Sequence, residues 1–203
     1  MIDHLVYGAP DLDNAIDDLE RRFGVRAAAG GRHVGIGTYN ALLALGPRTY
    51  LEVIAPDPDQ PAPANPRPFG LDDLTSSRLV GWALGCDDID AAIANSRARG
   101  YDPGDSIEMT RTAPNGTVLR WQLTLNAIGG GPVPFLISWG ATQHPATSAP
   151  HGLVLDAFEI EHPDPDSLAD MLHALGAEVD TKPGSADALV AHIRGHTATE
   201  VLR

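Results

Sequence analysis

One carboxylate in this sequence lies at an unusual place and could take part in catalysis or binding. The stretch Thr49–Pro56 reads TYLEVIAP, and its aromatic and β-branched residues favour a β-strand that the proline closes. Glu52 lies in the middle, where a strand rarely places a carboxylate and where burial of an unpaired charge is costly. It shares one face of the strand with Tyr50 and Ile54. Glu52 therefore faces water, a salt-bridge partner, or a cleft that holds a metal and a substrate.

A glycine-rich segment precedes this strand. It reads GGRHVGIGTYN over residues 30–40, and it is not a phosphate-binding loop because no Gly-Lys-Ser/Thr follows and it does not open a helix. Glycines in such a segment allow bulges and the close approach of another backbone. His33, Thr38 and Asn40 either line the floor of a cleft and bind a ligand, or satisfy local turns and strand edges.

A second strand pattern carries a possible anion-binding group. The stretch Thr117–Leu125 reads TVLRWQLTL, and its large apolar residues fall on one face while Arg120 and Gln122 fall on the other. This polar face is directed either to solvent or to the cleft. In a cleft, Arg120 would bind a carboxylate or another anionic group of a substrate.

Bulk properties exclude several classes of function. The chain has 203 residues and a formal net charge of −13, which argues against nucleic acids and anionic membrane surfaces as partners. The single cysteine, Cys86, excludes a disulfide within the chain and a cysteine-rich zinc site. No G-x-S-x-G elbow and no Rossmann fingerprint is present. The first residues lack signal-peptide regions and no apolar run approaches ~20 residues, so the expected location is cytoplasmic.

The elements that must position these side chains form internal repeats. The segment His4–Ile16 matches Gly81–Ile93 at an offset of 77 residues, and Ala157–Val179 is a fainter third copy. Each copy reads as a short apolar strand, an acidic turn and a helix that ends near glycine. The acidic residues at the helix start are typical N-caps, and the glycine is typical of a C-cap.

Strands rather than a second helix follow each of these helices. In the first copy they are expected at Val34–Thr38, Asn40–Leu45 and Tyr50–Ala55. In the second copy, Asn115-Gly116 is a strong hairpin signal. The repeating unit is therefore βαβββ, which predicts an α+β fold with mostly antiparallel strands.

The unit boundaries follow from breaks in composition. The stretch Pro56–Gly70 is too rich in proline for a regular helix or a central strand. We therefore expect a first unit at 1–56, a proline-rich crossover linker at 57–77, a second unit at 78–145 and a shorter third unit at 151–203.

These repeats and several motifs resemble a known group of proteins. Paired βαβββ units are typical of the vicinal oxygen chelate superfamily, which includes lactoylglutathione lyase, extradiol dioxygenases and bleomycin-resistance proteins. The chain resembles its glyoxalase-like domain branch most in GGRHVGIGTYNALLALGPRTYLEVIAP (30–56), PNGTVLRWQL (114–123), PFLISWG (134–140) and the following His144-Pro145. The resemblance implies curled sheets around an open cleft.

The resemblance also implies a metal site. In this superfamily the metal ligands come from the first and last strands of each unit, and the first unit here has His4 and Glu52 at those places. An imidazole and a carboxylate are competent ligands for a divalent Zn, Ni, Mn or Fe ion.

The second unit departs from the superfamily pattern. Gly81 and Ile137 stand where its ligands would be, and neither side chain can bind a metal. A third ligand could come from His144, just past the last strand of the unit, or from His33. Otherwise the cleft holds a metal loosely or not at all.

Two classes of function agree with these residues. The first is a metal-dependent lyase or isomerase that acts on a small carbonyl compound, with Glu52 as a metal ligand or as a general base. Dioxygenase chemistry ranks lower, although His4, Glu52 and His144 formally supply two histidines and one carboxylate.

The other class is a protein of the bleomycin-resistance type that binds or sequesters a small molecule without turnover. Its ligand would lie between Trp139, Tyr39 and aliphatic side chains and would be oriented by Arg120, His33 and Asn40. A third possibility is a cleft filled by the linker or by the C-terminal unit. A homodimer is compatible with either function.

Overall fold

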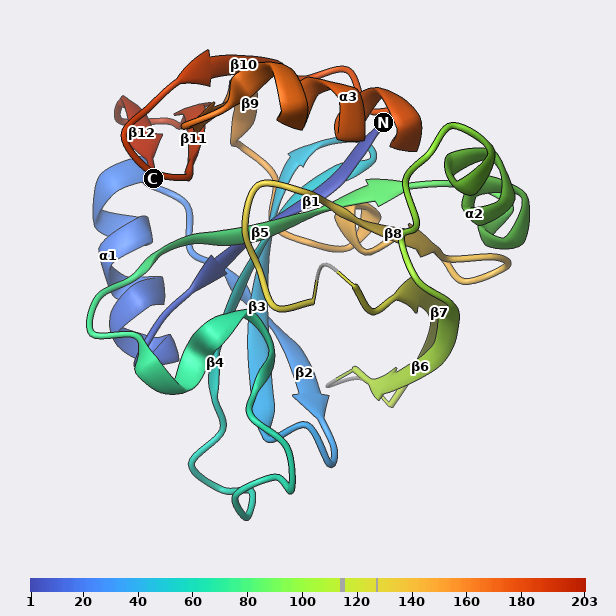
Figure 1. Cartoon of the computed structure of the whole chain (residues 1–203). Coiled ribbons are helices and arrows are strands. Elements are labelled where there is room, and N and C mark those ends of the chain that lie inside the picture. Colours follow the sequence, from blue (N-terminus) through green and yellow to red (C-terminus); the bar gives the residue numbers. More distant parts are fainter. Residues whose placement is uncertain (114–115, 127) are drawn as a thin grey trace.

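The computed structural model describes residues 1–113, 116–126 and 128–203. Within this part of the chain, eight strands close into a barrel in the order β1-β4-β3-β2-β6-β7-β8-β5 (Figure 1). The first repeat supplies β1 (Ile2–Gly8), β2 (Ala28–His33), β3 (Thr38–Gly46) and β4 (Thr49–Pro56). The second repeat supplies β5 (Arg78–Gly85), β6 (Ser106–Thr112), β7 (Val118–Thr124) and β8 (Phe135–Ser138). Each repeat therefore forms one half of the barrel.

Strand pairing follows the same plan in both halves. β1 runs parallel to β4 and β5 runs parallel to β8, while the other neighbouring strands are antiparallel. The halves meet along β1 and β5, and also at a short contact between β2 and β6 where Arg32 pairs with Thr112. The expected α+β fold of tandem, curled βαβββ units is confirmed.

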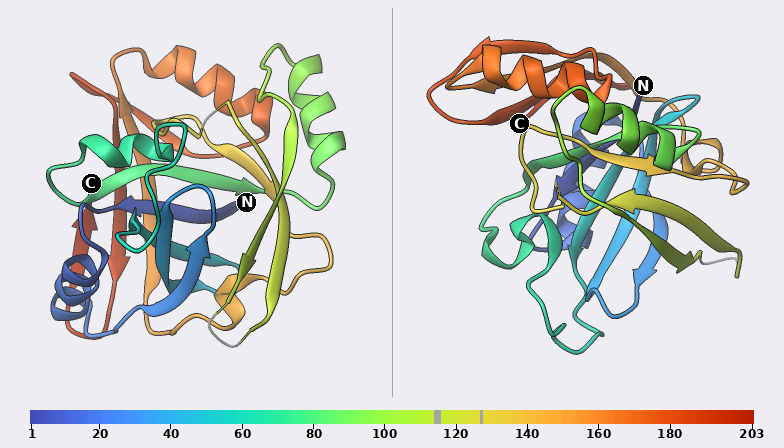
Figure 2. Two further views of the ribbon diagram at one scale, coloured as in Figure 1. Left: turned by 90° about the horizontal axis from the view of Figure 1, so that it is seen from below. Right: turned by 45° about the vertical axis from the view of Figure 1, so that its right-hand side comes forward.

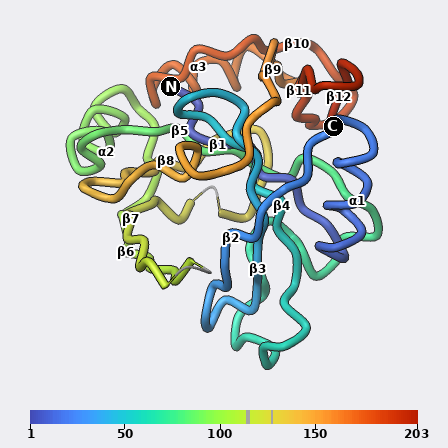
Figure 3. The backbone as a smooth tube through the Cα atoms, turned by 180° about the vertical axis from the view of Figure 1, so that it is seen from behind, coloured from blue at the N-terminus to red at the C-terminus, as the bar shows by residue number. Residues whose placement is uncertain are grey.

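The helices of the described ranges are α1 (Leu12–Phe23), α2 (Ile89–Ala98) and α3 (Pro165–Leu175). α1 and α2 pack on the outside of the barrel, whereas α3 packs against α2 and against the strands of the third repeat. Each helix begins at an aspartate whose side chain accepts a backbone N–H of the first turn, as expected for an N-cap, and these caps are Asp11, Asp88 and Asp164. α1 packs against β3 and β4, and the backbone trace in Figure 3 shows β6 and β7 on the side opposite α1.

The third repeat forms a sheet of its own. Its strands are β9 (Val154–His162), β10 (Asp180–Pro183), β11 (Ala188–Arg194) and β12 (Thr199–Leu202), in the order β10-β9-β11-β12. Figure 2 shows this unit as a layer beside the barrel. Phe158 packs edge-to-face on Trp82 of β5, and Glu200 accepts a 2.9 Å hydrogen bond from Arg22 of α1. The third unit therefore packs on the outside of the barrel, and both contribute side chains to one hydrophobic core.

One predicted strand is wrong. The segment Val34–Thr38 forms a turn up to Gly37, and the strand lies earlier, at β2. Gly35 and Gly37 have φ values of 81° and 72°, a backbone conformation that glycine adopts freely and that does not continue a strand. Asn115 of the predicted hairpin lies outside the described residues.

The linker between the two halves is irregular, as its prolines predicted. It contains one 3₁₀ segment, η1 (Pro68–Asp73), in which Phe69 and Gly70 leave helical geometry. A second, shorter one, η2 (Pro145–Thr147), follows β8. None of the helices in the described ranges is long and apolar enough to cross a membrane.

Alternation along the strands sorts side chains between the outer core and the barrel interior. In β4, Leu51 and Val53 belong to the core beneath the helices, whereas Tyr50, Glu52 and Ile54 line the interior. Alternation in β4 therefore separates Glu52 from the core side chains, and closure of the barrel turns its face inward.

Candidate functional site

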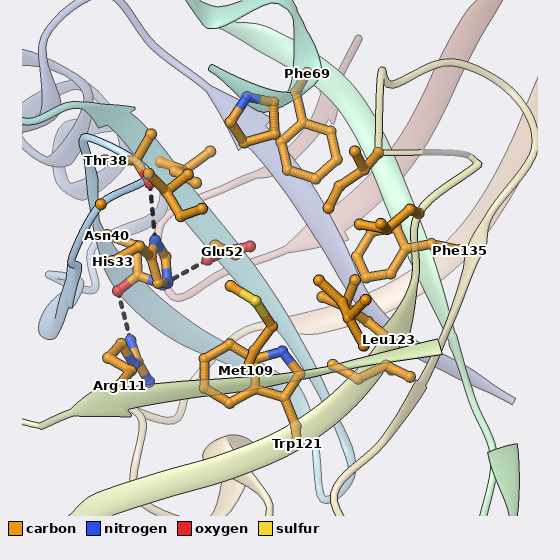
Figure 4. Close-up of a pocket in the computed structure, with 18 of the residues that line it drawn as sticks. His33, Thr38, Asn40, Glu52, Phe69, Met109, Arg111, Trp121, Leu123 and Phe135 are labelled. Atoms are coloured by element: carbon orange, nitrogen blue, oxygen red, sulfur yellow. Dashed lines mark hydrogen bonds between the residues drawn. The ribbon is translucent and has the colours of Figure 1, made fainter. Parts of the chain in front are cut away.

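The barrel encloses a cavity of about 300 Å³. Its lining comes from strands of both halves and from the linker, and within the described part of the chain no residue of the third unit contributes. Figure 4 shows the polar side chains gathered at one end, namely Glu52, Asn40, His33, Thr38 and Arg111. Apolar side chains form the rest, among them Phe69, Phe135, Leu123, Met109 and Trp121.

Glu52 lies at the polar end of this cavity. The residue is 8% exposed, and its Oε1 accepts a 2.5 Å hydrogen bond from Nδ2 of Asn40 on β3. Its Oε2 lies 3.7 Å from Nε2 of His4 on β1, which is longer than a hydrogen bond. Glu52 therefore faces the cavity with one oxygen held by Asn40 and the other available to a ligand.

His4 is oriented by its neighbour in the sequence. Adjacent residues of a strand normally point to opposite faces, but the pairing of β1 with β5 shifts register between Ile2 and His4, and this bulge brings Asp3 beside the imidazole. Oδ1 of Asp3 lies 2.7 Å from Nδ1 of His4. An ionised carboxylate can only accept, so Nδ1 of His4 carries a proton, and Nε2 is the ring atom that faces Glu52.

Asp3 also holds His144 and Trp139. The backbone N–H of Ala146 donates to Nδ1 of His144, so Nε2 of His144 donates to Oδ2 of Asp3 at 3.0 Å. Trp139 donates its Nε1–H to the same oxygen at 3.1 Å. Burial disfavours the charged Asp3, but the hydrogen bonds and charges of His144 and His4 outweigh it and lower the pKa of Asp3 to about 2.

These contacts place His144 behind Asp3 rather than in the cavity. Both of its ring nitrogens are occupied, and the ring is buried. It does not converge with His4 and Glu52 as a third metal ligand would. Trp139 does line the cavity and reaches Asp3 at the same time. Tyr50 stacks on His4 with ring centroids 4.6 Å apart, and burial raises its pKa well above the usual value, with the charges of Asp3 and Glu52 adding to the shift.

His33 and Thr38 lie in the lining, as the sequence pattern allowed. Nδ1 of His33 is 2.9 Å from Oγ1 of Thr38. Burial lowers the pKa of His33; the negative charge of Glu52 opposes this shift and the positive charge of Arg111 adds to it. His33 is therefore a neutral hydrogen-bonding group at neutral pH.

Arg120 and Gln122 lie elsewhere. They line a separate pocket on the opposite face of β7, because the apolar side chains of that strand, Trp121 and Leu123, occupy the barrel interior. The arginine of the cavity is Arg111 on β6, which the sequence analysis missed. Its strand carries Ile107 and Met109 on the same inward face, so the residue two positions on could have been recognised as inward as well.

The described residues offer a metal two protein ligands, His4 and Glu52. Metal bonds of about 2.0–2.2 Å could span the 3.7 Å between Nε2 of His4 and Oε2 of Glu52. Within the described residues, however, no group of three or more His, Cys, Asp or Glu side chains converges. Catalytic zinc sites use three protein ligands. The residues present therefore do not fit a metal centre that the protein holds by itself.

Phe69 occupies the corresponding place in the second half. A Cβ atom on Gly81 would lie 3.1 Å from the Phe69 ring, so the glycine at this ligand position makes room for the ring. Phe69 has a φ of 59°, unusual for a non-glycine residue, and its ring lies 6.0 Å from that of Phe135. The linker thus contributes to the cavity wall without filling the cavity.

Comparison with solved structures finds several similar proteins. A hypothetical protein from Staphylococcus aureus is similar over 97% of this chain and 91% of its own, with 15% sequence identity and a TM-score of 0.67. A mutant 4-hydroxymandelate synthase from Streptomyces coelicolor is similar over 99% of this chain and 61% of its own, with 15% identity and a TM-score of 0.56. Methylmalonyl-CoA epimerase from Mycobacterium tuberculosis has 21% identity over 68% of this chain and 86% of its own, with a TM-score of 0.45.

The family follows from a longer match in sequence. No curated protein matches the chain. The glyoxalase-like domain family matches residues 2–176, which include the whole barrel and the site described above. The identities of the solved structures support the fold alone. Together with the tandem βαβββ halves, the match over most of the sequence shows that this chain belongs to the glyoxalase-like domain family of the vicinal oxygen chelate superfamily.

Proposed function

We propose that this protein is an enzyme of the isomerase or lyase type that binds a small carbonyl compound in the barrel. Glu52 would remove a proton from the carbon next to the carbonyl group. One observation carries the proposal: a carboxylate at the polar end of a largely apolar cavity has one oxygen fixed by Asn40, while the other accepts no hydrogen bond from the described residues. A general base needs a fixed position within reach of the substrate proton.

The neighbours of Glu52 suit this role. Asn40 orients the carboxylate through its amide N–H, so that only Oε2 points to the substrate. His4 directs its Nε2 toward Glu52, and the Asp3 carboxylate holds the imidazole in this orientation through Nδ1. Oε2 of Glu52 and Nε2 of His4 lie 3.7 Å apart, so a proton removed at one substrate atom could be returned at a neighbouring one.

The metal-dependent form of this reaction, which the sequence favoured, needs a separate measurement. His4 and Glu52 supply only two ligands, so the substrate would have to contribute further oxygens. Metal content should be measured by inductively coupled plasma mass spectrometry on protein purified without a histidine tag, beside His4→Ala and Glu52→Gln. Stoichiometric metal in the parent that both variants lose would support a metal at this pair.

The proposed reaction can be tested without knowledge of the natural substrate. Exchange of the proton next to the carbonyl for deuterium should be followed by NMR in D₂O, with a panel of 2-oxo acids, hydroxyketones and aldehydes. We expect exchange with the parent protein, its loss in Glu52→Gln, and its retention in Glu108→Gln, which changes an exposed glutamate of β6. Exchange that survives in Glu52→Gln would refute the role of Glu52.

A second function, binding without turnover, is favoured by the apolar second half. Phe69 and Ile137 replace polar groups at the places where a symmetric site would have ligands. A sequestering protein would bind its ligand equally well in the parent and in Glu52→Gln, and neither would exchange protons. The same NMR panel separates this outcome from catalysis.

A further inference from the structure

The cavity holds a buried cation that the protein only partly satisfies. Arg111 is 6% exposed, and its Nη1 donates a 2.5 Å hydrogen bond to Oδ1 of Asn40. In the described part of the chain this is its one hydrogen bond, and no carboxylate lies within 4.0 Å of the guanidinium. A guanidinium has five N–H donors, and a buried charge without partners is costly. The remaining donors are therefore available to a ligand in the cavity.

The fold makes room for this side chain. A Cβ atom on Gly30 would overlap Nη1 of Arg111, and a Cβ atom on Gly31 would lie 3.0 Å from its Cδ. Glycine weakens the interior of a strand, so two consecutive glycines in β2 need a reason. The space they leave is filled by Arg111, which keeps the guanidinium at the cavity instead of on the outside of β6.

Glu52 does not remove the need for an anion. Asn40 stands between the two, with its oxygen on Arg111 and its Nδ2 on Glu52, so the amide separates the charges and takes up one donor of Arg111. Burial lowers the pKa of Arg111 while the charge of Glu52 opposes this, and arginine stays protonated in proteins. Glu52, a base, and Arg111, a cation, therefore lie at the same end of the cavity with Asn40 between them.

The rest of the cavity accepts a carbon skeleton. Met109 and Trp121 lie next to Arg111, and the walls beyond are formed by Phe69, Phe135 and Leu123 (Figure 4). Contacts of this kind favour an apolar or aromatic body, whereas a bidentate guanidinium favours a planar anion such as a carboxylate. Sugars lack the apolar body that these walls require.

We propose that Arg111 binds the carboxylate of the substrate and that the substrates are apolar or aromatic carboxylic acids. This assignment deepens the proposed function and rests on it, because the ligand is a substrate only if the protein is an enzyme. The carboxylate would pair with the free N–H groups of Arg111, which places the adjoining carbons near Glu52 across the Asn40 bridge. Arg111 thereby selects the substrate class, and Glu52 performs the chemistry.

The test compares two probes of the same shape, 3-phenylpropanoate and 3-phenylpropanamide. Binding is measured by isothermal titration calorimetry and by fluorescence of Trp121 and Trp139, which both line the cavity. We expect the parent protein to bind the carboxylate at least about ten-fold more tightly than the amide, because a charge-assisted pair exceeds a neutral one. Equal affinities, or no binding of the carboxylate up to its solubility limit, would overturn the assignment without any variant.

Single substitutions show which side chain causes the preference for the carboxylate over the amide. Arg111→Met should lose the ten-fold preference, Arg111→Lys should keep part of it, and Arg120→Met, on the opposite side of the sheet, should keep all of it. Circular dichroism and thermal unfolding show that each variant is folded. Preference that persists in Arg111→Met would overturn the assignment.

Glu52→Gln separates this inference from the proposed function. The variant should bind the carboxylate and fail to exchange protons. If neutral carbonyl compounds exchange while the carboxylate has no advantage, the substrate class is wrong and the role of Glu52 stands. If the carboxylate binds with the expected preference and nothing exchanges, the substrate pocket stands and catalysis fails.

Discussion

Asp3→Asn removes the negative charge that accepts hydrogen bonds from three side chains near the polar end of the cavity. The carboxylate accepts hydrogen bonds from His4, His144 and Trp139, all at buried or partly buried positions. Asparagine keeps the shape, but its NH₂ group must then face one of these donors. The variant therefore leaves a buried N–H group without an acceptor and releases the proton position of His4.

The size of the effect follows from the pKa. A shift of the Asp3 pKa from 3.8 in the unfolded chain to about 2 in the folded protein corresponds to about 2 kcal/mol of stability. The folded pKa is the lower one, so this contribution is fully present above pH 3.8 and is lost as the pH falls toward 2. We expect Asp3→Asn to lower the free energy of unfolding by about 2 kcal/mol at pH 7, and by less as the solution becomes acidic.

Urea unfolding followed by far-ultraviolet circular dichroism measures this difference. Fluorescence is unsuitable because Trp139 contacts the substituted side chain. The series runs from neutral pH to about pH 3, below the unfolded pKa. Glu108→Gln, at an exposed position of β6, is the control and should leave stability unchanged. Equal stability of the parent and Asp3→Asn at neutral pH, or a loss that stays constant into acid, would refute the reasoning.

Other substitutions test the packing around the cavity. Gly30→Ala would overlap the Arg111 guanidinium, and we expect a loss of about 1–3 kcal/mol in urea unfolding together with weaker carboxylate binding. Gly81→Ala places a methyl group 3.1 Å from the Phe69 ring and should cost about 1 kcal/mol; a double-mutant cycle with Phe69→Ala should remove this cost. Burial raises the pKa of Cys86 to about 11, so the native thiol should react slowly with iodoacetamide at neutral pH and rapidly once unfolded.

The sequence predicted the repeats well because they depend on local signals. An acidic cap, a helix and a closing glycine recur at nearly equal spacing, and each can be recognised within about a dozen residues. The strand expected at Val34–Thr38 failed because a run of glycines fits a turn as well as a strand. The position of β2 depends on its hairpin register with β3 and on its pairing with the distant strand β6, and local composition shows neither.

The polar residues behind the site were harder to predict. Asp3 and His4 are adjacent, and strict alternation places them on opposite faces; only the bulge against β5 brings them together. His144 meets Asp3 from a distant part of the chain, so no local pattern indicates the contact. Alternation in β7 correctly separated two faces, but which face looks inward depends on closure of the barrel. Arg120 lies on the outer face, whereas Arg111 of β6 lines the cavity.

The two halves of the barrel have diverged in a way that agrees with an amphipathic ligand. The first half keeps His4 and Glu52 on the strands where a symmetric site would have four ligands. In the second half, Gly81 has no side chain, and the Phe69 ring occupies the space beside it. Phe69 belongs to the linker and has a strained backbone conformation. A strained aromatic residue at that place persists only if its burial compensates for the strain. If the proposed function holds, the polar half and Arg111 would recognise the functional groups of a ligand, while the apolar half and the linker would exclude water from its carbon skeleton.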